Sequence, residues 1–502
     1  MFYHLHIITN GKAIQNITIR SVNMKKTWKK SVLGLAVAFV LIVMPLTAFA
    51  AQPPEGAEIT DIYSSWAGFD VFMASTVYGF GNEGTYSNFR GRLMTEKFAP
   101  VYASLADALG SDVTLDLQPG ELVTRGQTVA ALYALLSGEA AGADEAAEYF
   151  ASEGLMRGRA PGDYQLDAIC TVEEMIALSV RTYEYAVRAA GEDSKGFFWE
   201  IRGENNTVYL LGSIHLGDNV IYPLSEKIMT AFDRSANLVV EVDVANMSLE
   251  DILYIQSLQM VDYENGETIA DYLSEETFEL YVTLVEALEL PEEFYYLKPW
   301  AATLTLTTIF MSTGDVEESS AIGVDMLLLN KAYSMYKNIL ELESTRFQIE
   351  MFDSFSRELQ ELQLLEVLSS VLGTQWDGEG ADDADGETDD SNGDTDDDLA
   401  GAELQEIMAM FLAAIKAGDD DVFGAMMAMS RAIDKDDPLA VEYDTAMWAH
   451  RNIGMANGIA EYLESGTEDG DYFVVVGAGH LFGEDSVVIL LAEMGYEVVR
   501  VK

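Results

Sequence analysis

Two short stretches decide the fold of this chain: Thr207-Val-Tyr-Leu-Leu-Gly212-Ser-Ile-His215-Leu-Gly217 and Tyr472-Phe-Val-Val-Val-Gly477-Ala-Gly-His480-Leu-Phe-Gly483. In each, a β-rich apolar run ends at a glycine, and a histidine follows three residues later. Such runs predict buried strands, so both histidines are expected just beyond the carboxyl end of a strand. The neighbouring glycines allow the sharp turn and close approach that a site requires.

Two further strands are expected to end in acidic residues. The stretch Leu238-Val-Val-Glu241-Val-Asp243 alternates, which places Glu241 and Asp243 on one face, and Asn338-Ile-Leu-Glu341-Leu-Glu343 repeats the pattern. Strands and helices alternate from Gly196 onward, which predicts an α/β fold with helices layered on a sheet. Because ligands bind beyond the carboxyl ends of strands in open α/β sheets, these strands predict a site of His, Glu, Glu and His at one edge.

Histidines are scarce in this chain. Of five, His4 and His6 fall before the apolar segment near the amino terminus, which leaves His215, His450 and His480. A lone loop histidine is most simply explained by a hydrogen bond from its ring to nearby backbone, but the same Gly-x-x-His-Leu placement twice favours a shared site. Imidazoles and carboxylates suit a divalent transition metal such as manganese, cobalt or zinc, which makes bound water a nucleophile. His450, between apolar residues of a predicted helix, is interpreted as a packed helix residue.

The pair of Gly-x-x-His loops, separated by a long helical middle, resembles the TraB/GumN group, which includes the Tiki proteases. The resemblance covers about residues 197–502. Its further elements are Phe198-Trp-Glu200, Glu241, Leu297-Lys-Pro-Trp300, Gly323-Val-Asp325, Leu342-Glu343-Ser-Thr with Gln348, Arg451-Asn452 and Gly495-Tyr-Glu-Val-Val-Arg500. The resemblance implies a mixed sheet flanked by helices and a metal-dependent peptidase active with manganese or cobalt.

On the same resemblance, His215, Glu241 and His480 are the core site residues. Glu241 is either a metal ligand or the general base towards water, and the sequence leaves both roles open. Arg451 is a catalytic candidate because its guanidinium offers fixed donors to an oxyanion or a substrate carboxylate; the alternative is a helix-surface ion pair. Glu343 is a third catalytic candidate.

Asp243, Asp325 and Glu343 have two interpretations. They are partners that orient the histidine rings, or they are helix caps and solvated strand ends. The sequence favours an orienting role for Glu343 and a capping role for Asp325.

Three functions remain open. The first is hydrolysis of a peptide or protein, and the second is hydrolysis of a non-peptide ester or lactone by the same metal chemistry. The third is a binding module, in which the same pocket captures a peptide or a signal molecule without turning it over.

Charge and cysteine content exclude other classes. With 84 acidic against 29 basic residues, the formal net charge is −55, so the phosphates of a nucleic acid would be repelled. Cys170 is the only cysteine, which excludes an intrachain disulfide and a zinc site built from cysteines.

Residues 1–50 are interpreted as an export signal. Lys25, Lys26, Lys29 and Lys30 precede an apolar run over 32–46, and Ala48-Phe49-Ala50 supplies small residues at the cleavage positions. Cleavage is expected before Ala51, with Met24 as an alternative start and an uncleaved membrane anchor as the alternative fate. The protein is therefore expected outside the cytoplasm, secreted or in the cell envelope.

Residues 51–195 are expected to form a mostly helical domain, followed by the α/β domain over 196–502. Two stretches in the first domain, Leu122-Val-Thr-Arg and Ala168-Ile-Cys-Thr-Val-Glu-Glu, each place a threonine before an amphipathic helix, where its hydroxyl can cap the first amides. They are similar to degenerate S-layer homology repeats, which implies attachment to a cell-wall polymer. A plain helical domain is the alternative.

The segment 377–398 contains almost only Asp, Gly, Glu, Thr and Ser. Without apolar residues it cannot offset the entropy of ordering, so it is predicted to be a disordered insertion. Its Asp spacing does not match a twelve-residue calcium loop.

Overall fold

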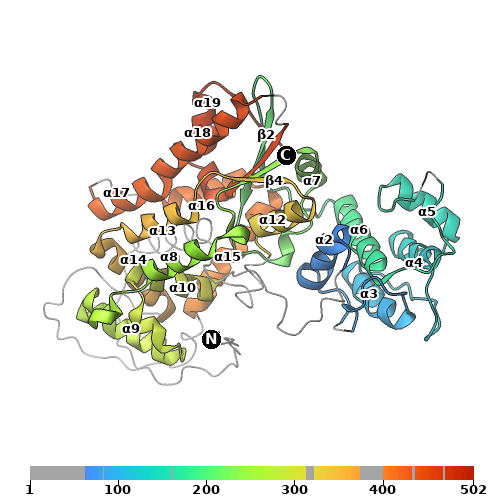
Figure 1. The fold of residues 1–502 in the computed structure, drawn as a ribbon, viewed down its shortest axis with the longest axis horizontal. Coiled ribbons are helices and arrows are strands. Elements are labelled where there is room, and N and C mark those ends of the chain that lie inside the picture. The colour runs from blue at the N-terminus through green and yellow to red at the C-terminus, as the bar shows by residue number, and fades with distance from the viewer. Residues whose placement is uncertain are drawn as a thin grey trace, which may run out of the picture.

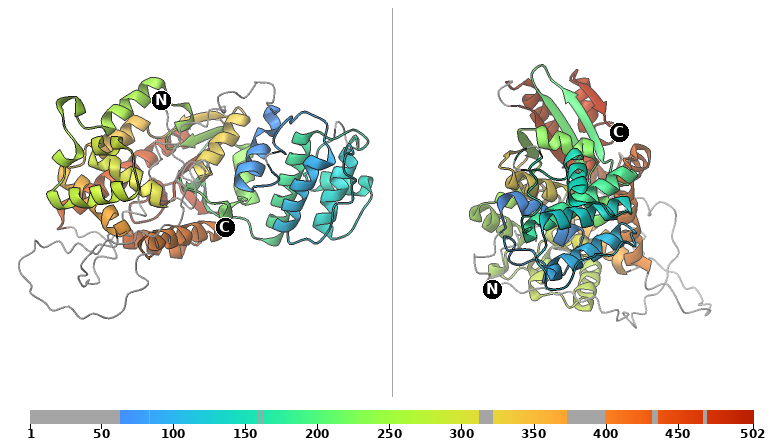
Figure 2. Two further views of the ribbon diagram at one scale, coloured as in Figure 1. Left: turned by 90° about the horizontal axis from the view of Figure 1, so that it is seen from below. Right: turned by 90° about the vertical axis from the view of Figure 1, so that its right-hand side faces the viewer.

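A computed structural model describes residues 63–502 apart from 83, 159, 161, 312–321, 373–398, 432–435 and 467–469. The expected export signal and the acidic segment 377–398 therefore lie outside the described residues. The chain forms a helical region followed by an α/β region, and these stand side by side in Figures 1 and 2. No helix among the described residues is long and apolar enough to cross a membrane.

The helical region is built on three helices that follow three short extended segments. Its elements are η2 (Ser65–Ala67), α2 (Gly68–Phe72), η3 (Met73–Val77), α3 (Thr95–Ala108), α4 (Arg125–Ser137), α5 (Ala143–Ser152) and α6 (Val172–Ala190). Both threonines that were expected to cap a helix do so. The hydroxyls of Thr124 and Thr171 accept from the backbone amides of Gln127 and Glu174, and the side chains of Gln127 and Glu174 accept from the backbone amides of the two threonines.

The extended segments before α3, α4 and α6 form a closed backbone ring. The amide of Leu93 donates to the carbonyl of Cys170, Cys170 donates to Val123, and Val123 donates back to Leu93, at 2.8, 2.9 and 3.0 Å. All three side chains are buried. The ring includes a third extended segment, before α3, which the sequence analysis did not predict. Met94 is the N-cap of that helix, and no capping box marks its start.

The α/β region contains a six-stranded mixed sheet, which confirms the predicted fold class. The strands are β1 (Phe197–Arg202), β2 (Thr207–Ser213), β3 (Asn237–Val240), β4 (Asn338–Glu341), β5 (Tyr472–Gly477) and β6 (Glu497–Arg500), in the order β4-β3-β5-β2-β1-β6. Strands β4, β3, β5 and β2 run parallel, while β1 pairs antiparallel with β2 and β6.

The burial of each strand agrees with its sequence pattern. Strands β3 and β5 are buried throughout, as continuous apolar runs of parallel sheets are, whereas the edge strands β4 and β6 are half-exposed. Ser213 pairs with Gly477, and Val240 pairs with both Val475 and Glu341. This register aligns the carboxyl ends of four parallel strands at one edge.

Helices cover both the sheet and this edge. Figure 1 shows α18 (His450–Glu464) and α19 (Val487–Glu493) on one side of the sheet and α7 (Glu226–Arg234) on the other. The remaining helices are α8 (Leu249–Gln259), α9 (Glu275–Ala287), α10 (Pro299–Met311), α12 (Val324–Ser334), α13 (Thr345–Asp353), α14 (Arg357–Leu372), α15 (Leu399–Ala417), α16 (Asp420–Ser430) and α17 (Pro438–Asp444). Short 3-10 or π turns are η4 (Asn219–Ile221), η5 (Val244–Asn246), η6 (Tyr263–Asn265), η7 (Ile269–Asp271), η8 (Glu292–Tyr296), η9 (Thr445–Ala449) and η11 (Ala478–Leu481).

Candidate active site

Two glycines fix the loop that carries His215. A Cβ on Gly217 would lie 2.0 Å from the carbonyl oxygen of Ile322, and one on Gly323 would lie 2.3 Å from the carbonyl oxygen of His215. The loop after β2 and the turn before α12 therefore cross at backbone contact, which no larger residue permits. The crossing brings Asp325, in the first turn of α12, against the imidazole of His215.

His215 is buried and is oriented by Asp325. Its Nδ1 lies 2.7 Å from Asp325 Oδ2, while its Nε2 has no hydrogen-bond partner among the described residues. Because a carboxylate accepts the Nδ1 proton, the Nε2 lone pair is left for another group. Burial opposes the charged ring, but the Asp325 carboxylate outweighs burial and raises the pKa of His215 above its ordinary value.

His480 is oriented by an amide instead of a carboxylate. Its Nδ1 lies 2.6 Å from Asn452 Oδ1, and Asn452 Nδ2 donates to the carbonyl of Asp485 at 3.0 Å. That carbonyl can only accept, which fixes the amide orientation and makes His480 Nδ1 the donor. Burial, followed by the positive charges of Arg451 and Arg431, holds the pKa of His480 well below its ordinary value. His480 is therefore neutral, and no described residue forms a hydrogen bond with its Nε2.

Glu241 directly follows β3 and is held by three donors. Its Oε1 accepts from the amide of Gly477 at 2.5 Å, and its Oε2 accepts from Arg451 Nη2 at 2.8 Å and Gln348 Nε2 at 3.3 Å. Oε1 also lies 3.8 Å from His480 Nε2. Burial raises the pKa of Glu241, and the Arg451 charge opposes that rise.

Arg451 joins Glu241 to the last acid of the predicted set, Glu343. Its Nε lies 2.9 Å from Glu343 Oε1 and its Nη2 lies 2.8 Å from Glu343 Oε2, which is a bidentate pair. The arginine is buried, so the predicted alternative of a helix-surface ion pair is wrong. Its Nη1 has no hydrogen-bond partner in the part of the chain that the structure describes, which leaves it as a free donor in the site.

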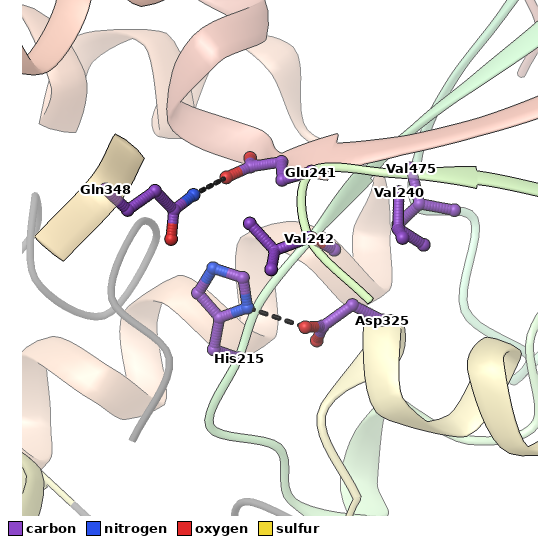
Figure 3. Close-up of a pocket in the computed structure, with 8 residues that line it drawn as sticks. His215, Val240, Glu241, Val242, Asp325, Gln348 and Val475 are labelled. Atoms are coloured by element: carbon purple, nitrogen blue, oxygen red, sulfur yellow. Dashed lines mark hydrogen bonds and ion pairs between the residues drawn. The ribbon is translucent and has the colours of Figure 1, made fainter. Parts of the chain in front are cut away.

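A small cavity lies between these groups. His215, Glu241, Asp325 and Gln348 project towards it in Figure 3. Its remaining lining residues are Ser213, Val240, Val242 and Val475. His480 and Glu343 are not among the lining residues.

The other predicted residues lie elsewhere. Asp243 accepts a hydrogen bond from Tyr333 and touches no histidine ring. His450 is exposed, so its interpretation as a packed residue is wrong. Successive helix positions point in different directions, so His450 faces solvent although the next residue of α18, Arg451, is buried. Asp325 orients a ring and is no cap, since Gly323 is the N-cap of α12. Glu343 binds Arg451 and Gln348 and orients no ring.

Two functional contacts went unassigned in the sequence. Asn452 and Gln348 were noticed only as parts of the family resemblance, although Asn452 fixes His480 and Gln348 bridges Glu241 and Glu343. The chemistry of the histidines could have indicated the role of Asn452. A buried imidazole with one nitrogen free for a ligand needs an acceptor at the other nitrogen, and Asn452 was a polar residue beside a site candidate.

Part of this donor set suits a divalent metal. Two buried imidazole nitrogens, each with its ring fixed through Nδ1, are suitable ligands for such an ion. Among the residues that the structure describes, however, no three His, Cys, Asp or Glu side chains are grouped as metal ligands. Within the described residues the two imidazoles alone do not complete a metal site, and a carboxylate ligand from Glu241 would have to exchange one of its protein donors.

Replacing Asp325 with Asn should lower the pKa of His215. The Asp325 carboxylate is the strongest influence that opposes burial, so its loss leaves only the charge of Glu241 against burial, and the ring takes up its second proton only at a lower pH than in the wild type. The 1H–15N or C2–H resonances of His215 in metal-free protein would report this titration. Asp243→Asn is the control, and an unchanged His215 titration in Asp325→Asn would contradict the assignment.

These features define an α/β protein with a buried polar site where the parallel strands of its mixed sheet end. The TraB/PrgY/gumN family model matches residues 197–500, and the chain belongs to that family. An uncharacterized protein of Treponema pallidum (strain Nichols) is 27% identical over 179 residues, which cover 35% of this chain and 51% of that protein. The match thus spans about half the length of that relative. No solved structure matches.

Proposed function

We propose that this protein is a metal-dependent hydrolase in which His215 and His480 hold a divalent ion such as manganese, cobalt or zinc. The observation that carries the proposal is the pair of buried Nε2 atoms without protein partners, each on a ring fixed through Nδ1. Such an ion would supply Lewis acidity, which polarises a carbonyl group and makes water more acidic. The resemblance to the Tiki proteases favours a peptide or protein substrate.

Glu241, Arg451 and Glu343 provide the proton acceptor, the oxyanion donor and its support. Glu241 is the proton acceptor towards water, because burial raises its pKa above the ordinary value while Gly477, Arg451 and Gln348 fix its position. Arg451 Nη1 is a buried donor without a partner, and it stabilises negative charge that develops on the carbonyl oxygen. Glu343 holds the guanidinium in place through the bidentate pair.

Metal content tests this proposal. After equilibration with manganese, cobalt or zinc and removal of free ions, the wild type should retain about one metal per chain by mass spectrometry. His215→Ala and His480→Ala should each lose it, because each removes one of two ligands. His450→Ala is the matched control, since this histidine is exposed, and it should bind as the wild type does. A wild type without metal, or variants that retain it, would refute the metal site.

A binding module is the second candidate, and one observation favours it. Both oxygens of Glu241 already accept protein donors, and the described residues hold no group of three metal ligands. In that case the free Nε2 atoms and Arg451 Nη1 bind a peptide or signal molecule directly. A wild type that binds peptides without cleaving them, with or without metal, would support this candidate against the hydrolase.

For the amino-terminal part we propose export and contact with a cell-wall polymer. The closed ring of Leu93, Val123 and Cys170 supports three equivalent repeats, in keeping with the resemblance to S-layer homology repeats. Sedimentation of the protein with purified cell walls tests this proposal, and protein that stays in the supernatant would contradict it.

A further inference from the structure

The hydrogen bond between Asn452 and His480 depends on which way the Asn452 amide is turned. A carboxylate only accepts, so Asp325 by itself keeps the proton of His215 on Nδ1. An amide carries an acceptor and a donor at two ends of similar shape. If Asn452 were turned end for end, its Nδ2 would donate to His480 Nδ1, and the proton of the neutral ring would move to Nε2. The Nε2 lone pair, on which the proposed metal site depends, would then be lost.

The backbone carbonyl of Asp485 decides this orientation. It accepts from Asn452 Nδ2 at 3.0 Å, which turns Asn452 Oδ1 towards His480 Nδ1 at 2.6 Å. Asp485 lies in the short loop between η11 and α19, where the amide of Ser486 donates to the carbonyl of Gly483 at 3.3 Å. The position of the proton on His480 therefore depends on what holds this loop.

Arg431, the C-cap residue of α16, holds the loop. Its Nη1 and Nη2 each lie 2.8 Å from one carboxylate oxygen of Asp485, which is a bidentate pair. The loop backbone also passes close to the guanidinium, since a Cβ on Gly483 would lie 2.9 Å from Arg431 Nη1. Arg431 Nε and Nη2 donate to Asp444 Oδ1 at 3.1 and 3.0 Å, which anchors the guanidinium to α17. The direction of the Asp485 side chain is thus fixed from α16 and α17.

A ring contact also joins Arg431 to His480. The guanidinium carbon of Arg431 lies over the Trp448 ring, 5.0 Å from its centre, which is a cation–π contact. The centre of the buried Trp448 ring lies 5.2 Å from that of the His480 ring. Arg431 therefore reaches His480 by two routes, one through hydrogen bonds and one through the Trp448 ring.

We propose that Arg431 is a positioning residue that fixes the tautomer of His480. By holding Asp485, it keeps the Asn452 amide in the orientation that leaves the proton on Nδ1 and the lone pair on Nε2. Arg431 is not among the residues that line the cavity, so it acts through these neighbours. The inference deepens the proposed hydrolase and rests on it for the use of that lone pair in metal binding. The tautomer itself is a property of the metal-free protein.

A purely structural ion pair is the alternative, and Arg500 is the matched control for it. Arg500 pairs with Asp420 at 2.9 Å, and its guanidinium carbon lies 4.8 Å from the centre of the Trp199 ring. Its side chain is 15% exposed, against 13% for Arg431. Its hydrogen bonds go to Asp420 and to backbone carbonyls beside β1 and β6. Arg500 thus has the same kinds of contact without the connection to His480.

NMR of metal-free protein labelled with 15N-histidine tests the proposal. At pH 8 the His480 ring is neutral, because its pKa lies well below the ordinary value, and the two ring nitrogens give different chemical shifts according to which one carries the proton. In the wild type, Nδ1 should be protonated and Nε2 unprotonated. In Arg431→Met the population of the Nε2–H tautomer should rise by about fivefold or more, the effect of losing one ordinary hydrogen bond. The signals of His215 should stay as in the wild type.

Two milder variants keep the test independent of folding. Asp485→Asn retains the backbone carbonyl but loses the ion pair with Arg431, and its side chain is 35% exposed, so it should fold and change His480 in the same direction. Arg431→Lys keeps the charge without the planar fork and should give a tautomer ratio between those of the wild type and Arg431→Met. Arg500→Met should lower the melting temperature and leave the His480 tautomer unchanged.

Three results would each overturn the proposal. They are a wild type with the proton on His480 Nε2, an unchanged tautomer in folded Arg431→Met or in Asp485→Asn, and an equal change in Arg500→Met, which would make the tautomer a consequence of stability alone. These results are separate from failure of the hydrolase, because neither metal binding nor cleavage is measured. If the tautomer changes as expected in a protein that binds no metal, the role of Arg431 stands and the hydrolase fails.

Discussion

Arg451→Met should lower the stability of the α/β region by about 3–5 kcal/mol, because it leaves two buried carboxylates without their cation. The side chains of Glu241 and Glu343 are only 6% and 7% exposed, and they share this one guanidinium. In a region of this size the loss corresponds to a Tm lowered by roughly 5–10 °C, measured by calorimetry at pH 7. The decrease should be smaller at pH 5, where the unpaired carboxylates take up protons and no longer need a cation.

A compensated variant separates charge from packing. Arg451→Met combined with Glu241→Gln and Glu343→Gln removes all three charges, and it should recover most of the lost stability, since neutral groups of similar shape replace the buried ions. If the free energy of unfolding of the single variant lies within about 1 kcal/mol of that of the wild type, the three residues do not form a buried ion network. If the triple variant is no better than the single one, the shape of the arginine matters more than its charge.

Glu241→Gln should lower the rate of peptide hydrolysis by about a hundredfold to ten thousandfold, the usual effect of losing a general base. The amide keeps the size of the side chain but cannot accept a proton from water at neutral pH. The rate is measured with metal-loaded protein on peptides that the wild type cleaves. Metal content and melting temperature are measured on the same samples.

Glu343→Gln is the matched control for this variant. Glu343 shares the partners Arg451 and Gln348 with Glu241 but does not line the cavity. If only the ion pair matters, both variants should lose activity equally. A much larger loss in Glu241→Gln supports its role towards water, whereas an active Glu241→Gln refutes that role.

The two histidines show how similar sequence motifs acquire different chemistry. Both follow a glycine by three residues and both lie beyond a parallel strand. Asp325 raises the pKa of His215, whereas Asn452 gives His480 an uncharged partner and leaves burial and nearby cations to lower its pKa. Their electrostatic difference therefore comes from α12 and α18.

By itself the sequence determined the α/β fold class and the end of the sheet at which the site lies. The reason is that an apolar run of five residues that ends at glycine predicts a buried parallel strand, and parallel strands present their carboxyl ends at one edge. It thereby indicated that His215, Glu241 and His480 each follow the end of a strand at that edge, whereas the order of the strands came from the structure. It could also identify the threonine caps of α4 and α6, because a capping box is local.

Only the tertiary structure decided which side chains contact these residues. Asp325, Asn452 and Arg451 lie on helices far along the chain, and their directions depend on how each helix is rotated against the sheet. A helix rotates its side chains by about 100° per residue, so adjacent positions separate: Arg451 is buried while His450 is exposed. Residue types and strand ends follow from local pattern, whereas partners, burial and pKa values follow from packing between distant segments.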